Sequence, residues 1–315
     1  MRLPHEWRNP SLFATPHAMN LVDQGKRVFI KDITHYLLPP SKQQGRIAPS
    51  LQRVKRGVGT GGMPVVVDSD VVSVESKDSG SDNDSGVAMD SPPRKVAPFP
   101  YENSVAEPNN PSVMPREILE KFHFTFLIRH PRSSIPSYYR CTIPPLVERT
   151  GFPYFMPEEA GYDELRRFFD YLRSSGLVGP QICGQDNSNV ENAAAGSVEI
   201  CVIDADDMLD DPEGILSKYC KSVGLEYKPE MLTWDTEEAH EFAKEQFEKW
   251  TGFHDDAINS KDLKPRKHKK AVKSDEELYA EWSEKYGKEG ADVIRKTVED
   301  NVADYEYLKQ FAIKA

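Results

Sequence analysis

The segment FTFLIRHPRSSIPSYYR (124–140) joins an apolar run to a cluster of cationic and hydroxyl side chains. Arg129 and Arg132 follow the run directly, and Ser137 comes one or two helical turns later. Guanidinium groups bind phosphate through charge-assisted hydrogen bonds, and a serine hydroxyl or the N-terminus of a helix adds further donors. The pattern therefore indicates a phosphate-binding turn. The alternative, which the residues leave equally open, is that both arginines bridge surface carboxylates.

The stretch RVFIKDITHYLLPP (27–40) contributes two further side chains with useful chemistry, Lys31 and His35. Imidazole titrates near neutral pH, so His35 has the basicity to accept a proton from a hydroxyl group. The ammonium group of Lys31 is suited to stabilising negative charge on a nearby oxygen. The alternative is structural, with a lysine at the end of a strand and a histidine hydrogen-bonded inside the fold.

Two segments nearer the C-terminus carry weaker signals. KPRKHKK (264–270) is a basic run in a chain with a net charge of −11. Such runs usually form solvated loops, and a nuclear-localisation role is also open. The segment WTGFHDDAIN (250–259) combines aromatic residues with a histidine. Core packing is the first interpretation for these rings, and an acceptor-binding pocket is the second.

Hydrophobic periodicity indicates the elements that position these side chains. Short runs rich in β-branched residues predict three strands, at 27–33, 123–128 and 198–205. Amphipathic patterns predict helices at 161–176 and 210–224, and the chain after Trp234 is mostly helical. Alternating strands and helices predict an α/β fold with a parallel sheet, where ligands bind beyond the carboxyl ends of strands. Arg129 lies at such an end.

Residues 63–110 differ in composition from both flanks. They are rich in Ser, Asp, Gly and Pro and poor in aromatic residues until their end. A segment of this kind buries too little apolar surface to offset the entropy lost on ordering. We predict a disordered, acidic insertion here, which divides the chain into an N-terminal part at 1–62 and a main α/β domain with a helical C-terminus at 111–315.

The overall composition excludes several classes of protein. The 315 residues contain 40 Lys and Arg against 51 Asp and Glu, which argues against general affinity for nucleic acid or an anionic membrane. No apolar stretch is long enough to span a bilayer, and the start lacks the apolar core of a signal peptide. The four cysteines are widely spaced and predict reduced thiols in a cytoplasmic protein. No motif indicates a metal site, so we predict none.

In order and spacing, these segments resemble the sulfotransferases that depend on PAPS (3′-phosphoadenosine 5′-phosphosulfate). Strand–Arg129-x7-Ser137 is similar to the family's 3′-phosphate-binding segment, which implies that Arg129 and Ser137 hold this phosphate, with Arg132 beside them. VEICVIDADDMLDDPEGILSKYCKSVGLEYKPEML (198–232) is similar to a structural strand–helix segment of the family. The span from residue 115 onward resembles a fungal group of these proteins. The resemblance implies a P-loop NTPase-like parallel sheet flanked by helices.

The same resemblance implies roles for three further residues. Residues 27–40 are similar to the family's strand–Lys-Thr-His-Leu-Pro segment, in which the lysine stabilises the transferring group and the histidine is the general base. Lys31 and His35 would take these roles, although three residues rather than one separate them. A late basic loop of the family contacts the 3′-phosphate, which implies a similar contact for Arg266.

The front of the chain departs from the family pattern. SLFATPHAMN (11–20) is nearest to the 5′-phosphosulfate loop, but His17 and Asn20 stand where arginine and serine are expected. We interpret this as a truncated or degenerate loop. The leading hypothesis is transfer of a sulfuryl group from PAPS to a hydroxyl of a small molecule. The alternative is an inactive relative that binds a nucleotide or a protein, and a P-loop kinase is disfavoured because no G-x-x-x-x-G-K-S/T motif occurs.

Overall fold

The structure is a computed structural model that describes residues 29–38, 107, 109–185, 198–247, 252–267 and 273–314. The phosphosulfate-loop candidate at 11–20 lies outside the described residues, as does nearly all of the predicted insertion at 63–110. The three domain boundaries predicted from the sequence therefore stay predictions.

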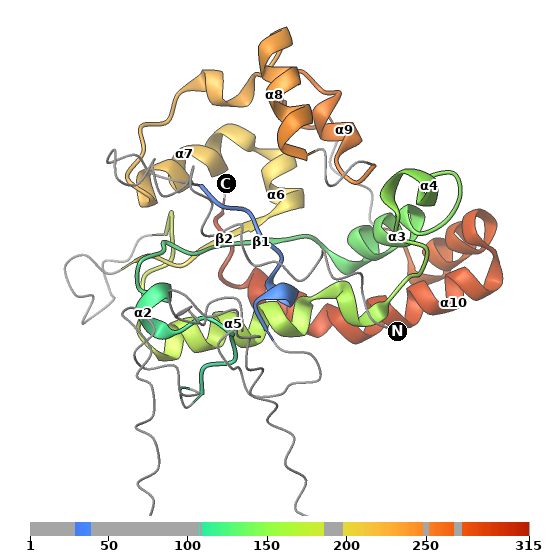
Figure 1. Cartoon of the computed structure of the whole chain (residues 1–315), viewed down its shortest axis with the longest axis horizontal. Coiled ribbons are helices and arrows are strands. Elements are labelled where there is room, and N and C mark those ends of the chain that lie inside the picture. Colours follow the sequence, from blue (N-terminus) through green and yellow to red (C-terminus); the bar gives the residue numbers. More distant parts are fainter. Residues whose placement is uncertain are drawn as a thin grey trace, which may run out of the picture.

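Two parallel strands cross the middle of the molecule (Figure 1). Strand β1 spans Thr125–Ile128 and β2 spans Cys201–Asp204, in a register that pairs Ile128 with Asp204. The strands predicted at 123–128 and 198–205 are thus confirmed. They run in the same direction, so their carboxyl ends meet at one edge, beside Arg129.

The strand predicted at 27–33 is wrong over the part that the structure describes. Residues 29–33 form no strand there, and a short 3-10 helix, η3 (Thr34–Tyr36), follows them. The side chain of Phe29 is 77% exposed and that of Ile33 is 39% exposed. Among residues 29–38, Phe29 and Ile33 therefore stay in solvent, and Leu38 is the first side chain of this segment described as fully buried.

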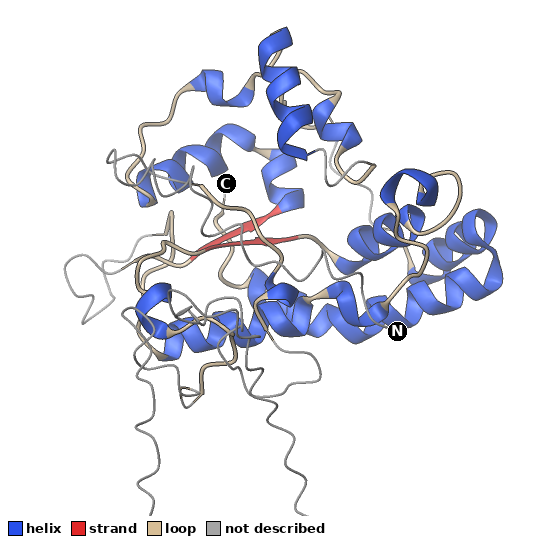
Figure 2. Ribbon diagram, viewed as in Figure 1, coloured by secondary structure: helices blue, strands red, loops and turns tan. Residues whose placement is uncertain are grey.

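Helices cover both sides of the strand pair (Figures 1 and 2). Helix α5 (Tyr162–Ser174) and the long α10 (Asp275–Lys309) lie on one side, and α6 (Ala205–Asp210) and α7 (Pro212–Ser222) lie on the other. The remaining elements are α2 (Arg116–Leu119), α3 (Pro131–Cys141), α4 (Val147–Thr150), η6 (Pro157–Ala160), η7 (Pro229–Leu232), α8 (Glu237–Phe247) and α9 (Asp255–Ile258). This arrangement is α/β, as predicted.

Local sequence signals set the helix ends. The carboxylate of Asp211 accepts a hydrogen bond from the N–H of Gly214, and Pro212 occupies the first helical position of α7. Gly224 adopts a left-handed conformation, with φ of 68°, just after α7 ends. Ser274 and Glu277 form a reciprocal capping box at the start of α10. The helices predicted at 161–176 and 210–224 are confirmed by α5 and α7.

Packing in the core determines the position of β1 relative to α5. All four residues of β2 are buried, whereas β1 buries Phe126 and Ile128 and leaves Leu127 exposed. The ring of Phe126 meets Phe169 of α5 edge to face, with centroids 5.0 Å apart. Because these contacts anchor β1, the chain leaves the core at a defined point, immediately before Arg129.

Candidate functional site

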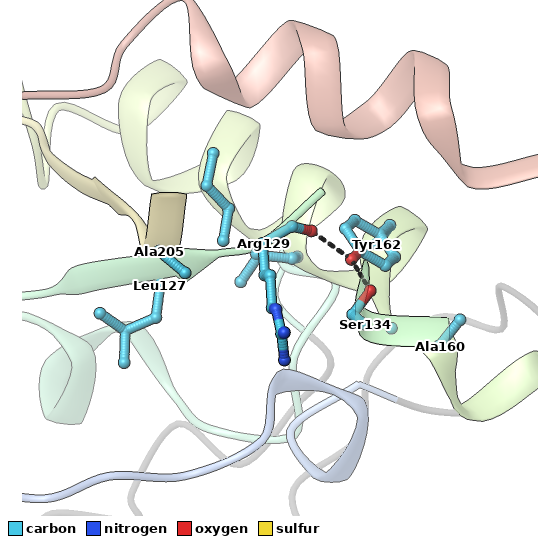
Figure 3. Close-up of a pocket in the computed structure, with 9 residues that line it drawn as sticks. Leu127, Arg129, Ser134, Ala160, Tyr162 and Ala205 are labelled. Carbon is cyan, nitrogen blue, oxygen red and sulfur yellow. Dashed lines mark hydrogen bonds between the residues drawn. The ribbon is translucent and has the colours of Figure 1, made fainter. Parts of the chain in front are cut away.

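A cavity of about 310 Å³ opens where β1 ends (Figure 3). It is bounded by the end of β1, the first turn of α3, the η6–α5 junction and the start of α6. Its apolar lining consists of Leu127, Ile128, Ala160, Leu165 and Ala205. Its polar side chains are Arg129, Ser134 and Tyr162. The cavity thus lies where the sequence predicted a ligand site, with a guanidinium group at its wall.

Arg129 is the cation of this cavity. Its side chain is exposed, and it forms no ion pair with any carboxylate among the residues that the structure describes. In Figure 3 its guanidinium points away from the α3–α5 side of the cavity. A positive group held at the end of a buried strand, with its donors uncommitted to described carboxylates, is suited to binding an anion.

The first turn of α3 offers fewer donors than the sequence indicated. Pro131 has no N–H, and the N–H of Arg132 donates to Nδ1 of His130 at 3.1 Å. The N–H groups of Ser133 and Ser134 donate to the carbonyl oxygen of His130. Because this end of the helix is already capped, an anion beside Arg129 depends on side-chain donors rather than on the backbone.

Arg132 follows the alternative interpretation that the sequence left open. Its guanidinium forms an ion pair with Asp275 at the start of α10, 2.6 Å away. Ser137 is half-buried on α3 and does not line the cavity. It lies three residues beyond Ser134, which corresponds to a rise of about 4.5 Å along the helix axis. Of the predicted phosphate contacts, only Arg129 faces the cavity directly.

Sequence reasoning missed Ser134 and Tyr162. The phenol oxygen of Tyr162 lies 2.5 Å from the carbonyl oxygen of Arg129 and 2.5 Å from Oγ of Ser134. Burial raises the pKa of Tyr162 to about 12, against the opposing effects of the Ser134 hydroxyl and the Arg129 charge. No local signal marks Tyr162, because it follows a glycine that begins an ordinary amphipathic helix.

His35 and Lys31 have different surroundings. The Nδ1 atom of His35 lies 3.8 Å from Oε1 of Glu164 on α5, two residues after the cavity residue Tyr162. The interaction with Glu164 raises the pKa of His35 and outweighs its burial. Lys31 is exposed, and its charge adds to burial in lowering the pKa of His254. The structure therefore brings His35 to the helix that borders the cavity, whereas Lys31 is not among the residues that line it.

Arg266 lies in an ion-pair cluster of its own. Its guanidinium contacts Asp206 at 2.9 Å and Asp210 at 2.7 Å, and Nη2 also donates to the carbonyl oxygen of Asp206. The backbone N–H of Arg266 donates to the carbonyl oxygen of Leu209. These contacts tie the basic run to α6, and Arg266 does not line the cavity.

A buried carboxylate, that of Asp204, lies next in sequence to the cavity residue Ala205. Asp204, only 1% exposed, ends β2 and caps α6 by accepting hydrogen bonds from the N–H groups of Asp206 and Asp207. It also accepts a 2.8 Å bond from the phenol of Tyr305 and lies 3.2 Å from Nζ of Lys309. These bonds and the Lys309 charge outweigh burial and lower the pKa of Asp204. The network joins the end of β2 to α10.

Other findings concern residues away from the cavity. All four cysteines are buried free thiols, as predicted. Phe253 packs edge to face on Phe152, which agrees with the core-packing interpretation of the segment at 250–259. Within the described part of the chain, no helix has the length and apolarity needed to cross a membrane, and no group of three metal-binding side chains occurs.

Comparisons with known proteins concern the same region. Residues 171–253 match the family profile described as sulfotransferase domain. Sulfotransferase ppzF from Metarhizium majus (strain ARSEF 297) is 27% identical over 207 residues, which are 65% of this chain and 57% of that protein. Sulfotransferase ppzF from Metarhizium rileyi (strain RCEF 4871) is 26% identical over an alignment of the same coverage. No solved structure matches the chain.

The chain therefore spans little more than half the length of the curated relatives that it matches. The profile match includes β2, with Asp204, and the two partners of Arg266 on α6. It begins after Arg129 and so does not include this residue. Of helix α5, which begins with Tyr162, only the last turn lies within the matched residues. The profile match and the two relatives therefore show that part of this chain is similar to fungal sulfotransferases.

Proposed function

We propose that the chain binds PAPS and transfers its sulfuryl group to a hydroxyl of a small-molecule acceptor. The observation that carries this proposal is the position of Arg129, an exposed guanidinium at the carboxyl end of β1 that faces no carboxylate among the described residues. Arg129, with Ser137 one turn beyond the cavity, would hold the 3′-phosphate. Arg132 and Arg266 already have carboxylate partners and would support the surrounding loops.

PAPS supplies the activated sulfuryl group when it is bound. In the transfer, a bond forms between the acceptor oxygen and sulfur, and the bond from sulfur to the 5′-phosphate oxygen breaks. His35 would accept the proton of the acceptor hydroxyl, and Lys31 would stabilise negative charge on the departing oxygen. Glu164 supports this role, since its carboxylate lies on the side of the imidazole opposite Nε2, 3.8 Å from Nδ1.

Calorimetric titration of the full chain with 3′-phosphoadenosine 5′-phosphate tests the nucleotide site. Replacing Arg129 by Ala should weaken binding by roughly 30-fold or more, the scale of a lost charge-assisted hydrogen-bonding group. Arg295→Ala, which removes an exposed arginine of α10, controls for the change in net charge. Absence of binding by the unaltered chain would exclude the proposal.

A second candidate is a nucleotide-binding protein without transfer activity. It is favoured by the phosphosulfate-loop candidate at 11–20, in which His17 and Asn20 stand where arginine and serine are expected. Incubation with PAPS and a panel of phenols and alcohols separates the two functions. Nucleotide binding without sulfated product would support the second candidate, and a sulfated product would exclude it.

A further inference from the structure

Tyr162 connects three elements at the edge of the cavity. It is the first residue of α5, and its ring is buried, with 7% of the residue exposed. Its hydroxyl lies 2.5 Å from the carbonyl oxygen of Arg129, the residue after β1, and 2.5 Å from Oγ of Ser134 on α3. Figure 3 shows both contacts converging on the phenol oxygen.

The donors in this group have a single consistent order. A carbonyl oxygen only accepts, so the one phenol proton of Tyr162 is donated to Arg129. The phenol oxygen then accepts the proton of Ser134, whose other acceptor, the carbonyl oxygen of His130, lies farther away at 3.4 Å. The hydroxyls of Ser134 and Tyr162 therefore form a chain that ends on the backbone of Arg129.

This chain restrains the backbone from which the Arg129 side chain leaves. The carbonyl of Arg129 is held toward the phenol of Tyr162, and the Arg129 side chain leaves this fixed backbone in a different direction (Figure 3). Exposed arginine side chains are otherwise flexible, and holding one in place for a ligand costs side-chain entropy. A fixed backbone at Arg129 removes part of that cost before the ligand arrives.

We propose that Tyr162 is a positioning residue, which orients Arg129 for an anionic ligand through the hydroxyl chain from Ser134. This inference rests on the proposed function, because it assigns Arg129 to the phosphate of the nucleotide. Burial keeps the phenol of Tyr162 protonated throughout the neutral range, so the donor to Arg129 does not switch off with pH.

The test uses Tyr162→Phe, which keeps the buried ring and removes only the hydroxyl. Calorimetry with 3′-phosphoadenosine 5′-phosphate should show affinity about 10-fold weaker, the scale of one lost hydrogen bond to a positioned group. Tyr307→Phe is the matched control, because the phenol of Tyr307 contacts Asp170 and Arg173 on α5, and Tyr307 does not line the cavity. Its nucleotide affinity should be unchanged.

A double variant separates positioning from a general loss of stability. If Tyr162 acts through Arg129, then Arg129→Ala combined with Tyr162→Phe should bind no more weakly than Arg129→Ala alone. An equal loss in both backgrounds would overturn the inference, as would unchanged affinity in Tyr162→Phe. Ser134→Ala, which leaves the bond from Tyr162 to Arg129 in place, should have a smaller effect than Tyr162→Phe.

A measurement without ligand keeps this inference distinct from the proposed function. The Nε–H signal of Arg129 in nitrogen-15 NMR should show a more mobile side chain in Tyr162→Phe than in the unaltered chain or in Tyr307→Phe. If the unaltered chain does not bind the nucleotide, the proposed function fails, and this signal still tests the positioning. Equal mobility of Arg129 in all three proteins would overturn it.

Discussion

The imidazole of His35 lies against the carboxylate of Glu164, with Nδ1 3.8 Å from Oε1. The contact joins the segment that precedes the core to the first turn of α5, and both side chains are largely buried. It raises the pKa of His35 and lowers the pKa of Glu164. In each residue, the interaction with the partner is the largest cause of the shift. Because a general base must be unprotonated, this contact determines the pH range in which His35 can act.

Replacing Glu164 by Gln should lower the pKa of His35 toward its ordinary value near 6.5. The acid limb of the pH dependence of kcat/KM, measured with PAPS and an acceptor, should then move to lower pH. An NMR titration of the His35 ring protons measures the same shift without requiring activity. Glu159→Gln is the matched control, because Glu159 also raises the pKa of His35 but is the smallest of the contributions. An unchanged His35 titration in Glu164→Gln would contradict the assignment.

The same pair predicts how stability depends on pH. The raised pKa of His35 contributes stability that is present below about pH 6.5 and is lost as pH rises through the folded-state value. The lowered pKa of Glu164 contributes stability above about pH 4.3 that is lost as pH falls through its folded-state value. The pair should therefore stabilise the protein most between these limits. Glu164→Gln should flatten the unfolding free energy across this window.

The buried carboxylate of Asp204 gives a separate prediction. Lys309→Met removes the cation nearest to Asp204 and should lower the unfolding free energy by about 2 kcal/mol, because a buried charge loses a partner. Urea unfolding at neutral pH measures this loss. Lys296→Met removes an exposed i,i+4 pair with Asp300 and should change stability by no more than about 0.5 kcal/mol.

Acid unfolding should also depend on the hydrogen bonds of Asp204. The pKa of Asp204 is lowered in the folded protein, so its contribution is present above about pH 3.9 and is lost as pH falls through the lower folded-state value. In Tyr305→Phe the carboxylate loses one of its donors, and its folded-state pKa should rise. Acid unfolding of this variant should therefore begin at higher pH than in the unaltered chain. Unfolding at the same pH in both proteins would contradict the network.

The sequence was sufficient to predict the elements with strong local signals. Strand β2 begins with the apolar residues Cys201–Ile203 and is buried throughout, and α7 follows Asp211, begins at Pro212 and ends before Gly224. These features depend on neighbouring residues, so periodicity and capping rules find them. The position of Arg129 after β1 follows from the same rules, together with the rule for the carboxyl ends of parallel strands.

Contacts between distant residues explain what the sequence did not show. The bond from Tyr162 to the carbonyl of Arg129 joins residues 33 positions apart, and Asp204 meets Tyr305 across 101 positions. Neither contact leaves a periodic pattern. The strand predicted at 27–33 failed for the related reason that burial is decided by the rest of the fold: Phe29 and Ile33 are apolar, yet they find no covering layer among the described residues.

Two roles are open to Arg266. The family resemblance implies a contact with the 3′-phosphate, and the structure shows ion pairs with Asp206 and Asp210. Arg266→Lys cannot span both Asp206 and Asp210 with a planar fork, so the unfolding free energy should fall by about 1–2 kcal/mol. Affinity for 3′-phosphoadenosine 5′-phosphate should stay within roughly threefold, a change of less than about 0.7 kcal/mol. A large loss of affinity with unchanged stability would instead support a direct contact with the 3′-phosphate.

Gly290 determines how closely α10 approaches α3, the helix that carries Ser134 and Ser137. A Cβ at this position would lie 2.8 Å from the phenol oxygen of Tyr139 and 2.9 Å from Cβ of Tyr286. Alanine ordinarily stabilises a helix interior relative to glycine by about 1 kcal/mol, whereas overpacking costs about 1–3 kcal/mol. We therefore expect a net loss of stability in Gly290→Ala, measured by urea unfolding. Adding Tyr139→Phe removes the phenol oxygen and should recover part of that loss, while the contact with Tyr286 remains. A stabilised Gly290→Ala variant would show that the two helices separate without cost.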